Sequence, residues 1–351
     1  MHRLIAQTAD MFRWFLICLT GLASILPPAG VAAGEIRWRV NSLLHPHLFG
    51  ESARVFAEEV RTVSGGTFQV EVHDQLVLDV NAFEALRSGL VDAVWGSPGH
   101  HHREAPSVTL FGGFPFGPGP EGLTEWMVEA GGQEALNDLY TRHGLISIYC
   151  GALPSEGGGW FKSPIGSVED LDGLAMRSFG YGARTLRKLG VTTFELPASD
   201  IRPAFETGVI DAAEFAMPSI DALLNFPDFA PYLFLPGWQQ PSTSLELLVL
   251  EKTWLALSES DREIVLRGCE DSLRWTLDVA ASRQEATIEE FRARGVQVLS
   301  WPDEILDALR LSWQEVIEEE VREDPNVSVA WKSYLRFVRQ EDAAEDSLGQ
   351  N

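Results

Sequence analysis

One pattern occurs twice in the sequence, and this duplication limits the folds that the chain can adopt. The segments FEALRSGLVDAVWGS (residues 83–97) and IRPAFETGVIDAAEFA (residues 201–216) each read as a short helix, a glycine cap and the start of a strand. Asp92 and Asp211 occupy matched places in them. Copies about 120 residues apart are spaced far more widely than the units of a solenoid. The pattern therefore predicts two similar lobes.

A strand–helix–strand unit precedes the first copy and indicates the fold class. The segment IRWRVNSL (residues 36–43) alternates apolar and polar side chains, as a half-buried strand does. ESARVFAEEVRTV (residues 51–63) has one apolar helical face and is followed by the cap Gly65-Gly66. TFQVEV (residues 67–72) alternates again. Parallel β-α-β units, and hence an α/β fold, are expected.

A long helical pattern runs from Ser258 to Gly295. Ser258 is placed as its N-cap, with Asp261 three residues further on. At about 1.5 Å per residue such a helix is longer than one lobe, so we expect it to brace both. Another helix is expected from Asp303 to Val321, and the acidic tail from Glu341 is expected to fray.

The first 33 residues have the features of a secretory signal peptide. Arg3 and Arg13 precede the apolar segment WFLICLTGLASIL (residues 14–26). The small residues VAA then lead to a cleavage point after Ala33. The apolar segment is short for a membrane span, and Cys18 lies inside the part that would be removed. We therefore expect a soluble mature chain, exported to the periplasm.

The mature chain is strongly acidic. The full chain has 27 Lys and Arg against 51 Asp and Glu, a net charge of −24. Removal of two arginines and one aspartate with the leader leaves 25 against 50, or −25. Such an excess disfavours nucleic acid and anionic membranes as partners. The two remaining cysteines, Cys150 and Cys269, are equally consistent with a disulfide and with two separate buried thiols.

Candidate binding residues follow from the ends of the expected strands, where α/β sheets bind ligands. In LDGLAMRSFG (residues 171–180), Arg177 ends a short apolar strand and precedes Ser178 and Gly180, which leave room for a ligand. Its planar fork suits a carboxylate, although a lone strand arginine is more often a surface residue in an ion pair. The strand of the second copy ends at Glu214-Phe215, and Glu214 reads equally well as a helix-start carboxylate. The further candidates are Glu156, Trp160, Trp238, Gln240 and His100 to His102.

An enzymatic function finds little support in the motifs. The sequence contains no G-x-S-x-G, no H-E-x-x-H and no P-loop. Three adjacent histidines on extended chain point in alternating directions, so His100, His101 and His102 are not expected to chelate one zinc ion together. A secreted metal-dependent hydrolase that uses these histidines is the alternative hypothesis.

Three segments carry a resemblance to a known family. FKSPIGSVEDLDGLAMRSFG, ASDIRPAFETGVIDAAEFA and PYLFLPGWQQP resemble the solute receptors of tripartite ATP-independent periplasmic (TRAP) transporters, most of all the branch that binds 2-oxo acids together with a metal cation. The resemblance covers nearly all of the mature chain and implies a two-lobed periplasmic binding protein fold, no enzymatic activity and membrane permease subunits as partners. It also implies that Arg177 holds the ligand carboxylate.

The resemblance further implies a cation site made of oxygen ligands. Glu214 matches the metal-binding glutamate of the branch, and Phe215 stands where a tryptophan contributes its backbone oxygen. Glu156 replaces a glutamine and Gln240 replaces a glutamate, which leaves the number of carboxylates unchanged. Such a site suits Ca²⁺ or Na⁺. The other expected ligand contacts are Ser97, His101, Phe179 and Trp238.

The domain boundaries and the oligomeric state complete the expectations. We place residues 34–153 and 243–285 in the first lobe, residues 154–242 and 286–340 in the second, and a flexible tail at 341–351. Dimers of the branch use a long C-terminal helix, and the polar ending RQEDAAEDSLGQN argues against such a dimer here. A receptor that feeds a sensor in place of a transporter would share the same pocket.

Overall fold

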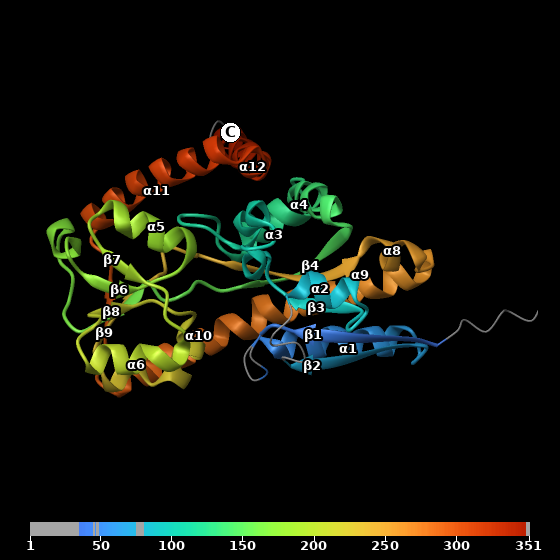
Figure 1. The fold of residues 1–351 in the computed structure, drawn as a ribbon, viewed down its shortest axis with the longest axis horizontal. Helices are drawn as coiled ribbons and strands as arrows, with labels where there is room; N and C mark the ends of the chain where they lie inside the picture. Colours follow the sequence, from blue (N-terminus) through green and yellow to red (C-terminus); the bar gives the residue numbers. More distant parts are fainter. Residues whose placement is uncertain (1–34, 45, 47–48, 75–80, 349–351) are drawn as a thin grey trace, which may run out of the picture. The chain divides into compact units, whose positions relative to one another are not determined.

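The computed structural model describes residues 35–44, 46, 49–74 and 81–348. From Ile36 onward they form one structural unit, which contains two mixed β-sheets (Figure 1). The first has the strand order β2-β1-β3-β10-β4 and the second the order β11-β9-β5-β8-β6-β7. The strands are β1 (Ile36–Ser42), β2 (Phe68–Asp74), β3 (Ala93–Gly96), β4 (Leu145–Leu153), β5 (Gly159–Phe161), β6 (Ala175–Arg177), β7 (Thr192–Phe194), β8 (Ala212–Ala213), β9 (Tyr232–Leu235), β10 (Thr243–Leu250) and β11 (Gln297–Ser300).

Helices surround each sheet and complete a lobe, so the expected two-lobed α/β fold is confirmed. Strands β1, β2 and β3 run parallel, whereas β10 pairs antiparallel with β3 and β4. The chain therefore leaves the first lobe after β4 and returns along β10. The α-helices are α1 (Gly50–Val63), α2 (Ala82–Arg87), α3 (Pro120–Val128), α4 (Gly132–Tyr140), α5 (Gly180–Lys188), α6 (Ala198–Glu206), α7 (Pro218–Asp221), α8 (Glu251–Ala256), α9 (Glu259–Trp275), α10 (Ala281–Ala293), α11 (Asp303–Glu323) and α12 (Pro325–Leu348).

The duplicated segments have equivalent structures in the two lobes. Each provides a helix (α2 or α6) and then a strand inside its sheet (β3 or β8). Asp92 lies just before β3, and its Oδ2 accepts a hydrogen bond of 2.8 Å from the backbone N–H of Arg39. Asp211 lies just before β8, with its Oδ1 3.6 Å from Lys162 Nζ. The matched aspartates thus anchor strands and lie outside the binding cavity described below.

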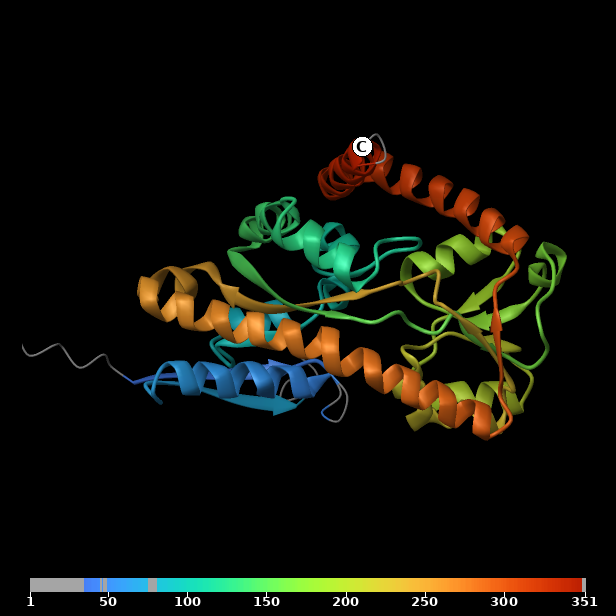
Figure 2. The same ribbon diagram turned by 180° about the vertical axis from the view of Figure 1, so that it is seen from behind.

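The long helical pattern forms α9 and α10, joined by a five-residue π-helical segment, η7 (Thr276–Ala280) (Figure 2). Ser258 caps α9 by accepting a hydrogen bond from the Asp261 N–H, as predicted. α9 packs on α1 and β4 of the first lobe, whereas α10 packs on α7 and β11 of the second. The expected brace between the lobes is therefore confirmed.

The C-terminal helices differ from the expectation. α11 packs on α5 of the second lobe, but α12 packs on α4 and on the short 3₁₀ helix η2 (Pro106–Gly112) of the first. Val327, Ala330 and Phe337 are buried in the first-lobe core there. The assignment of all of residues 286–340 to the second lobe was therefore wrong. α12 also continues past Glu341 to Leu348, which removes the premise of our argument against a dimer.

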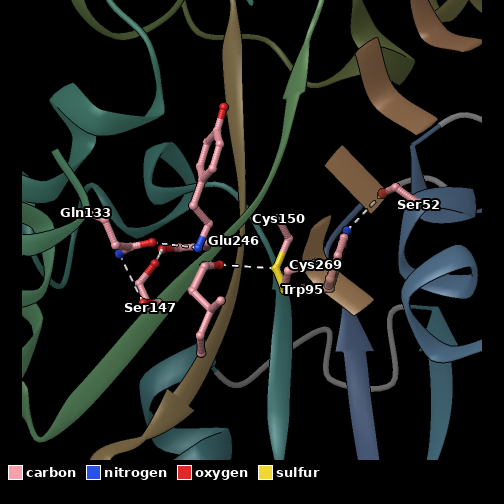
Figure 3. The surroundings of a disulfide bond; sticks show 9 residues. Ser52, Trp95, Gln133, Ser147, Cys150, Glu246 and Cys269 are labelled. Carbon is pink, nitrogen blue, oxygen red and sulfur yellow. Dashed lines mark hydrogen bonds between the residues drawn. A yellow bond between two sulfur atoms is a disulfide. The ribbon is translucent and has the colours of Figure 1, made fainter. Parts of the chain in front are cut away.

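Cys150 and Cys269 form a disulfide bond, which settles an alternative that the sequence left open (Figure 3). Cys150 lies on β4 and Cys269 on α9, and both side chains are buried. The bridge therefore ties the edge strand of the first sheet to the long helix that spans both lobes.

Candidate functional site

A cavity of about 360 Å³ is lined by residues of both lobes. This volume lies within the range of small-molecule binding pockets. Eight of the sequence candidates line the cavity: Ser97, His100, Glu156, Arg177, Phe179, Glu214, Phe215 and Gln240. Its other polar lining residues include Gln239 and Thr243.

Arg177 is held along one edge of its guanidinium group and presents the other to the cavity. Its Nε donates to the Leu196 carbonyl at 3.2 Å, and its Nη1 donates to the Glu214 carbonyl at 2.5 Å. The group also lies 4.9 Å from the centre of the Phe215 ring, a cation–π contact. No hydrogen bond joins Nη2 to any residue that the structure describes. Arg177 is thus positioned by backbone carbonyls with donors left for a ligand.

Three carboxyl groups gather around this single arginine. Glu214 Oε2 lies 3.5 Å from Arg177 Nη1. Asp221 is fully buried and accepts hydrogen bonds from Trp160 Nε1 at 2.7 Å and from the Ala216 N–H at 3.1 Å, so its role is structural. Loss of hydration, and then the charges of Glu214 and Asp221, raise the pKa of Glu156 well above its usual range. Burial also raises the pKa of Glu214, and Arg177 opposes this shift.

These pKa shifts predict how stability depends on pH. A carboxyl group whose pKa is higher in the folded than in the unfolded protein favours folding while it is protonated, and this contribution is lost as the pH rises above the unfolded pKa. Without divalent cations, we expect the free energy of unfolding to fall as the pH rises above about 5, through the raised pKa values of Glu156 and Glu214. Ca²⁺ would offset the charges, so saturating Ca²⁺ should flatten the decline. Thermal unfolding with EDTA and with Ca²⁺ measures both curves, and parallel curves would contradict the prediction.

Gln239 is a residue that the sequence analysis missed. Its Nε2 donates to the Gly157 carbonyl at 2.7 Å and lies 3.5 Å from Glu156 Oε2. Its Oε1 is buried and has no hydrogen-bond partner. Gln240 lines the same cavity, but its Nε2 donates to Thr243 Oγ1 at 2.5 Å. The amide beside Glu156 is thus that of Gln239, which no sequence motif distinguished from its neighbour.

The oxygen atoms at the second-lobe wall of the cavity fit a hard cation. Carboxylate, amide and backbone oxygens are the ligands that Ca²⁺ takes. The buried Oε1 of Gln239 accepts no hydrogen bond, so it is available as such a ligand. Within the described ranges, no three His, Cys, Asp or Glu side chains are arranged to hold a metal ion. A cation here would therefore depend on amide and main-chain oxygens in addition to Glu156 and Glu214.

The three adjacent histidines diverge, and the expected ligand contact of His101 was wrong. They lie on and just after a 3₁₀ turn, η1 (Pro98–His101), not on extended chain. The His101 side chain is buried in the first lobe, where its Nε2 lies 3.4 Å from Glu246 Oε1. His102 contacts the Phe179 ring at 5.2 Å between centroids. His100 is the histidine that lines the cavity.

Trp238 is also placed differently from the expectation. Its side chain is buried and does not line the cavity. It packs against Phe116 at 5.8 Å between ring centroids, and its carbonyl accepts a 2.8 Å hydrogen bond from the Phe116 N–H. Phe116 lies in the glycine- and proline-rich segment GGFPFGPGP that leaves η2 of the first lobe. Trp238 therefore holds this segment against the second lobe.

An apolar wall completes the cavity, and the sequence did not single it out. Phe49, Leu153 and Met217 belong to one buried cluster, against which Leu44 and Ile220 pack. All five residues line the cavity. The first lobe supplies Leu44, Phe49 and Leu153, and the second lobe supplies Met217 and Ile220. The three segments lie far apart in the sequence, so no local pattern connects them.

No helix in the described part of the chain is long and apolar enough to cross a membrane. The predicted signal peptide, residues 1–33, lies outside the described residues.

Comparisons with known proteins agree with this architecture. Residues 43–324 match the family model for bacterial extracellular solute-binding protein, family 7. A monocarboxylate 2-oxoacid-binding periplasmic protein of Nostoc sp. is 27% identical over 318 residues, which cover 89% of this chain and 87% of that protein. A TRAP transporter solute-binding protein of Bordetella bronchiseptica, with copurified calcium and picolinate, superposes with a TM-score of 0.80 at 28% identity, covering 90% of this chain and 97% of the other.

A TRAP periplasmic solute-binding protein of Colwellia psychrerythraea, with bound calcium and pyruvate, gives a TM-score of 0.81 at 25% identity and covers 90% of this chain and 98% of the other. Members of such a family bind solutes and are not enzymes, and nothing in the site supports the hydrolase hypothesis. The family match covers most of the chain, and the two-lobed fold superposes on the matched structures over 90% of this chain. This protein therefore belongs to the bacterial extracellular solute-binding proteins of family 7.

Proposed function

We propose that this protein is the solute receptor of a TRAP transporter and binds a small 2-oxo or 2-hydroxy monocarboxylic acid together with a cation. The observation that carries the proposal is Arg177, whose guanidinium group has one edge open to the cavity. The relatives named above, which bind 2-oxo acids or calcium with a carboxylate, support it.

Each residue of the site has a role in this proposal. Arg177 donates hydrogen bonds to the ligand carboxylate, worth about 1.5–3 kcal/mol and more in a dry site. A bound Ca²⁺ or Na⁺ supplies positive charge and coordination positions for ligand oxygens. The cation is held by Glu156, Glu214, the Phe215 carbonyl and Gln240. Gln239 Oε1 is a further oxygen ligand for it. Ser97 and Phe179 complete the wall, and closure of the lobes excludes water.

Calorimetry on the purified protein tests this ligand class. Pyruvate, 2-oxobutyrate and lactate are titrated with Ca²⁺, with Na⁺ and after removal of both ions. At least one acid should bind, and more tightly with a cation than without. If none of the three binds under any of these conditions, the proposed ligand class is wrong.

The exchange of carboxylate and amide between residues 156 and 240 gives a sharper prediction. Glu156→Gln leaves Glu214 as the only carboxylate on the proposed cation and should weaken cation-linked binding. Gln240→Glu in the same protein should recover much of the loss, because the total charge matters more than its position. We expect a coupling of about 0.5–3 kcal/mol, measured by a double-mutant cycle at fixed Ca²⁺. Additive effects would place the two side chains on separate sites.

Export and transport are also part of the proposal. The cleavage site after Ala33 predicts that the mature protein in a periplasmic extract begins at Gly34, which N-terminal sequencing would test. Deletion of this gene and, separately, of the cognate permease genes should abolish uptake of the labelled acid equally. Uptake that persists without the receptor, together with a lost signalling response, would favour the sensor function.

A further inference from the structure

The orientation of the His100 ring is set by the local backbone. Ser97 caps the 3₁₀ turn η1 and makes reciprocal hydrogen bonds with it. The Ser97 hydroxyl oxygen accepts from the Gly99 N–H at 3.3 Å, and the Ser97 N–H donates to His100 Nδ1 at 3.0 Å. A neutral imidazole has one donor and one acceptor nitrogen. Because Nδ1 accepts, the proton of the neutral ring is on Nε2.

The surroundings of His100 favour the neutral ring. Protonation would place a second N–H at Nδ1, directly against the Ser97 N–H. Although the residue keeps access to solvent, packing in the cleft removes part of the hydration of the ring. This loss, and next the proximity of His101, shift the pKa of His100 below its usual range. His102 acts in the same direction, and the buried Glu246 opposes it. At neutral pH the residue is therefore an uncharged donor.

His100 also lines the cavity in which the ligand is proposed to bind. Its side chain is exposed, and it lines the cavity from the first lobe, whereas Arg177 lines the same cavity from the second. The neighbouring histidines are used elsewhere: His101 lies beside Glu246, and His102 contacts Phe179.

We propose that His100 is a specificity-determining residue whose Nε2–H binds the 2-oxo or 2-hydroxy oxygen of the acid that Arg177 holds. This inference rests on the proposed function. It assigns one ligand group to each lobe, the carboxylate to Arg177 and the adjacent oxygen to His100. An acid without the 2-oxygen then keeps the first contact and lacks the second.

Two acids that differ only in this oxygen, pyruvate and propanoate, provide the test. Their affinities are measured by calorimetry at fixed Ca²⁺ for the wild type, His100→Phe and His100→Gln. Phe fills a similar volume without a donor, whereas the Gln amide can replace Nε2–H. We expect His100→Phe to weaken pyruvate binding about 10-fold and propanoate binding less than about 2-fold, and His100→Gln to stay within about 3-fold of wild type for both.

The neighbouring substitution His102→Phe serves as the matched control and should leave the ratio of the two affinities unchanged. Equal losses for both acids in His100→Phe, or no loss for either, would overturn this inference and leave the proposed function standing. Failure of the wild type to bind either acid would overturn the proposed function and this inference with it.

A second measurement uses the unaltered protein, so it does not depend on the folding of a variant. Nitrogen-15 NMR of the histidine rings should show His100 as the neutral Nε2–H tautomer at pH 7. Pyruvate, but not propanoate, should shift the Hε2 resonance downfield. A ring protonated at Nδ1, or equal responses to the two acids, would contradict the assignment.

Discussion

Arg177→Ala should abolish measurable binding of 2-oxo acids while the protein stays folded. The Arg177 side chain is only 12% exposed, and its free edge is directed at a cavity that the carboxyl groups of Glu156 and Glu214 also line. Truncating one partner of a buried charge pair costs about 2–5 kcal/mol, which corresponds to a loss of roughly 30- to 5,000-fold in affinity. Much of this loss comes from the ligand carboxylate, which would then lie near Glu156 and Glu214 with only the bound cation to offset their charges.

Stability should suffer far less than binding. The substitution removes two hydrogen bonds to backbone carbonyls, those of Leu196 and Glu214. The two carboxyl groups can hold protons, because their pKa values are already raised by burial. Circular dichroism and thermal unfolding should therefore show a folded variant.

Two further arginine variants make this result specific. Arg177→Lys keeps the charge but loses the planar fork, so its affinity should lie between those of the wild type and Arg177→Ala. Arg187 lies on α5, the helix that follows the strand of Arg177. It donates to Thr193 Oγ1 at 2.7 Å and does not line the cavity. Arg187→Ala should bind normally. A folded Arg177→Ala protein with unchanged affinity would place the ligand elsewhere.

The position of Arg177 could be predicted because it follows from local rules. A short apolar strand ending in a charged residue, followed by small residues, is expected at the binding edge of an α/β sheet. Glu214 was found in the same way, as the end of the duplicated pattern, and the structure pairs the two strands in parallel. The two-lobed fold followed from the duplication itself.

The residues that were missed or assigned wrongly depend on side-chain direction and on contacts between distant segments. His100 and His101 differ by one position, and only the 3₁₀ turn with its Ser97 cap decides which ring enters the cavity. Likewise, Gln239 and Gln240 point to different partners, Gly157 and Thr243, after the chain turns at Trp238. α12 was assigned to the wrong lobe because its partners, α4 and η2, lie some 200 residues earlier in the chain.

Loss of the Cys150–Cys269 disulfide should destabilise the protein strongly and leave ligand affinity nearly unchanged. The two residues are 119 positions apart, so the bridge closes a long loop in the unfolded chain. In the chain-entropy model a loop of this length is worth about 4–5 kcal/mol. For a protein of this size the melting temperature should fall by about 5–10 °C. Neither cysteine lines the cavity, so binding below the transition should persist.

The measurement compares the oxidised protein from Gly34 onward with the reduced protein and with Cys150→Ala/Cys269→Ala. Thiol titration of the denatured, unreduced protein should find no free thiol, and reduction should reveal two. Reduction should lower the melting temperature of the wild type and leave that of the double variant unchanged, which separates the bridge from the packing of two buried sulfur atoms. Two free thiols before reduction, with equal melting temperatures in both redox states, would instead support the separate buried thiols that the sequence also allowed.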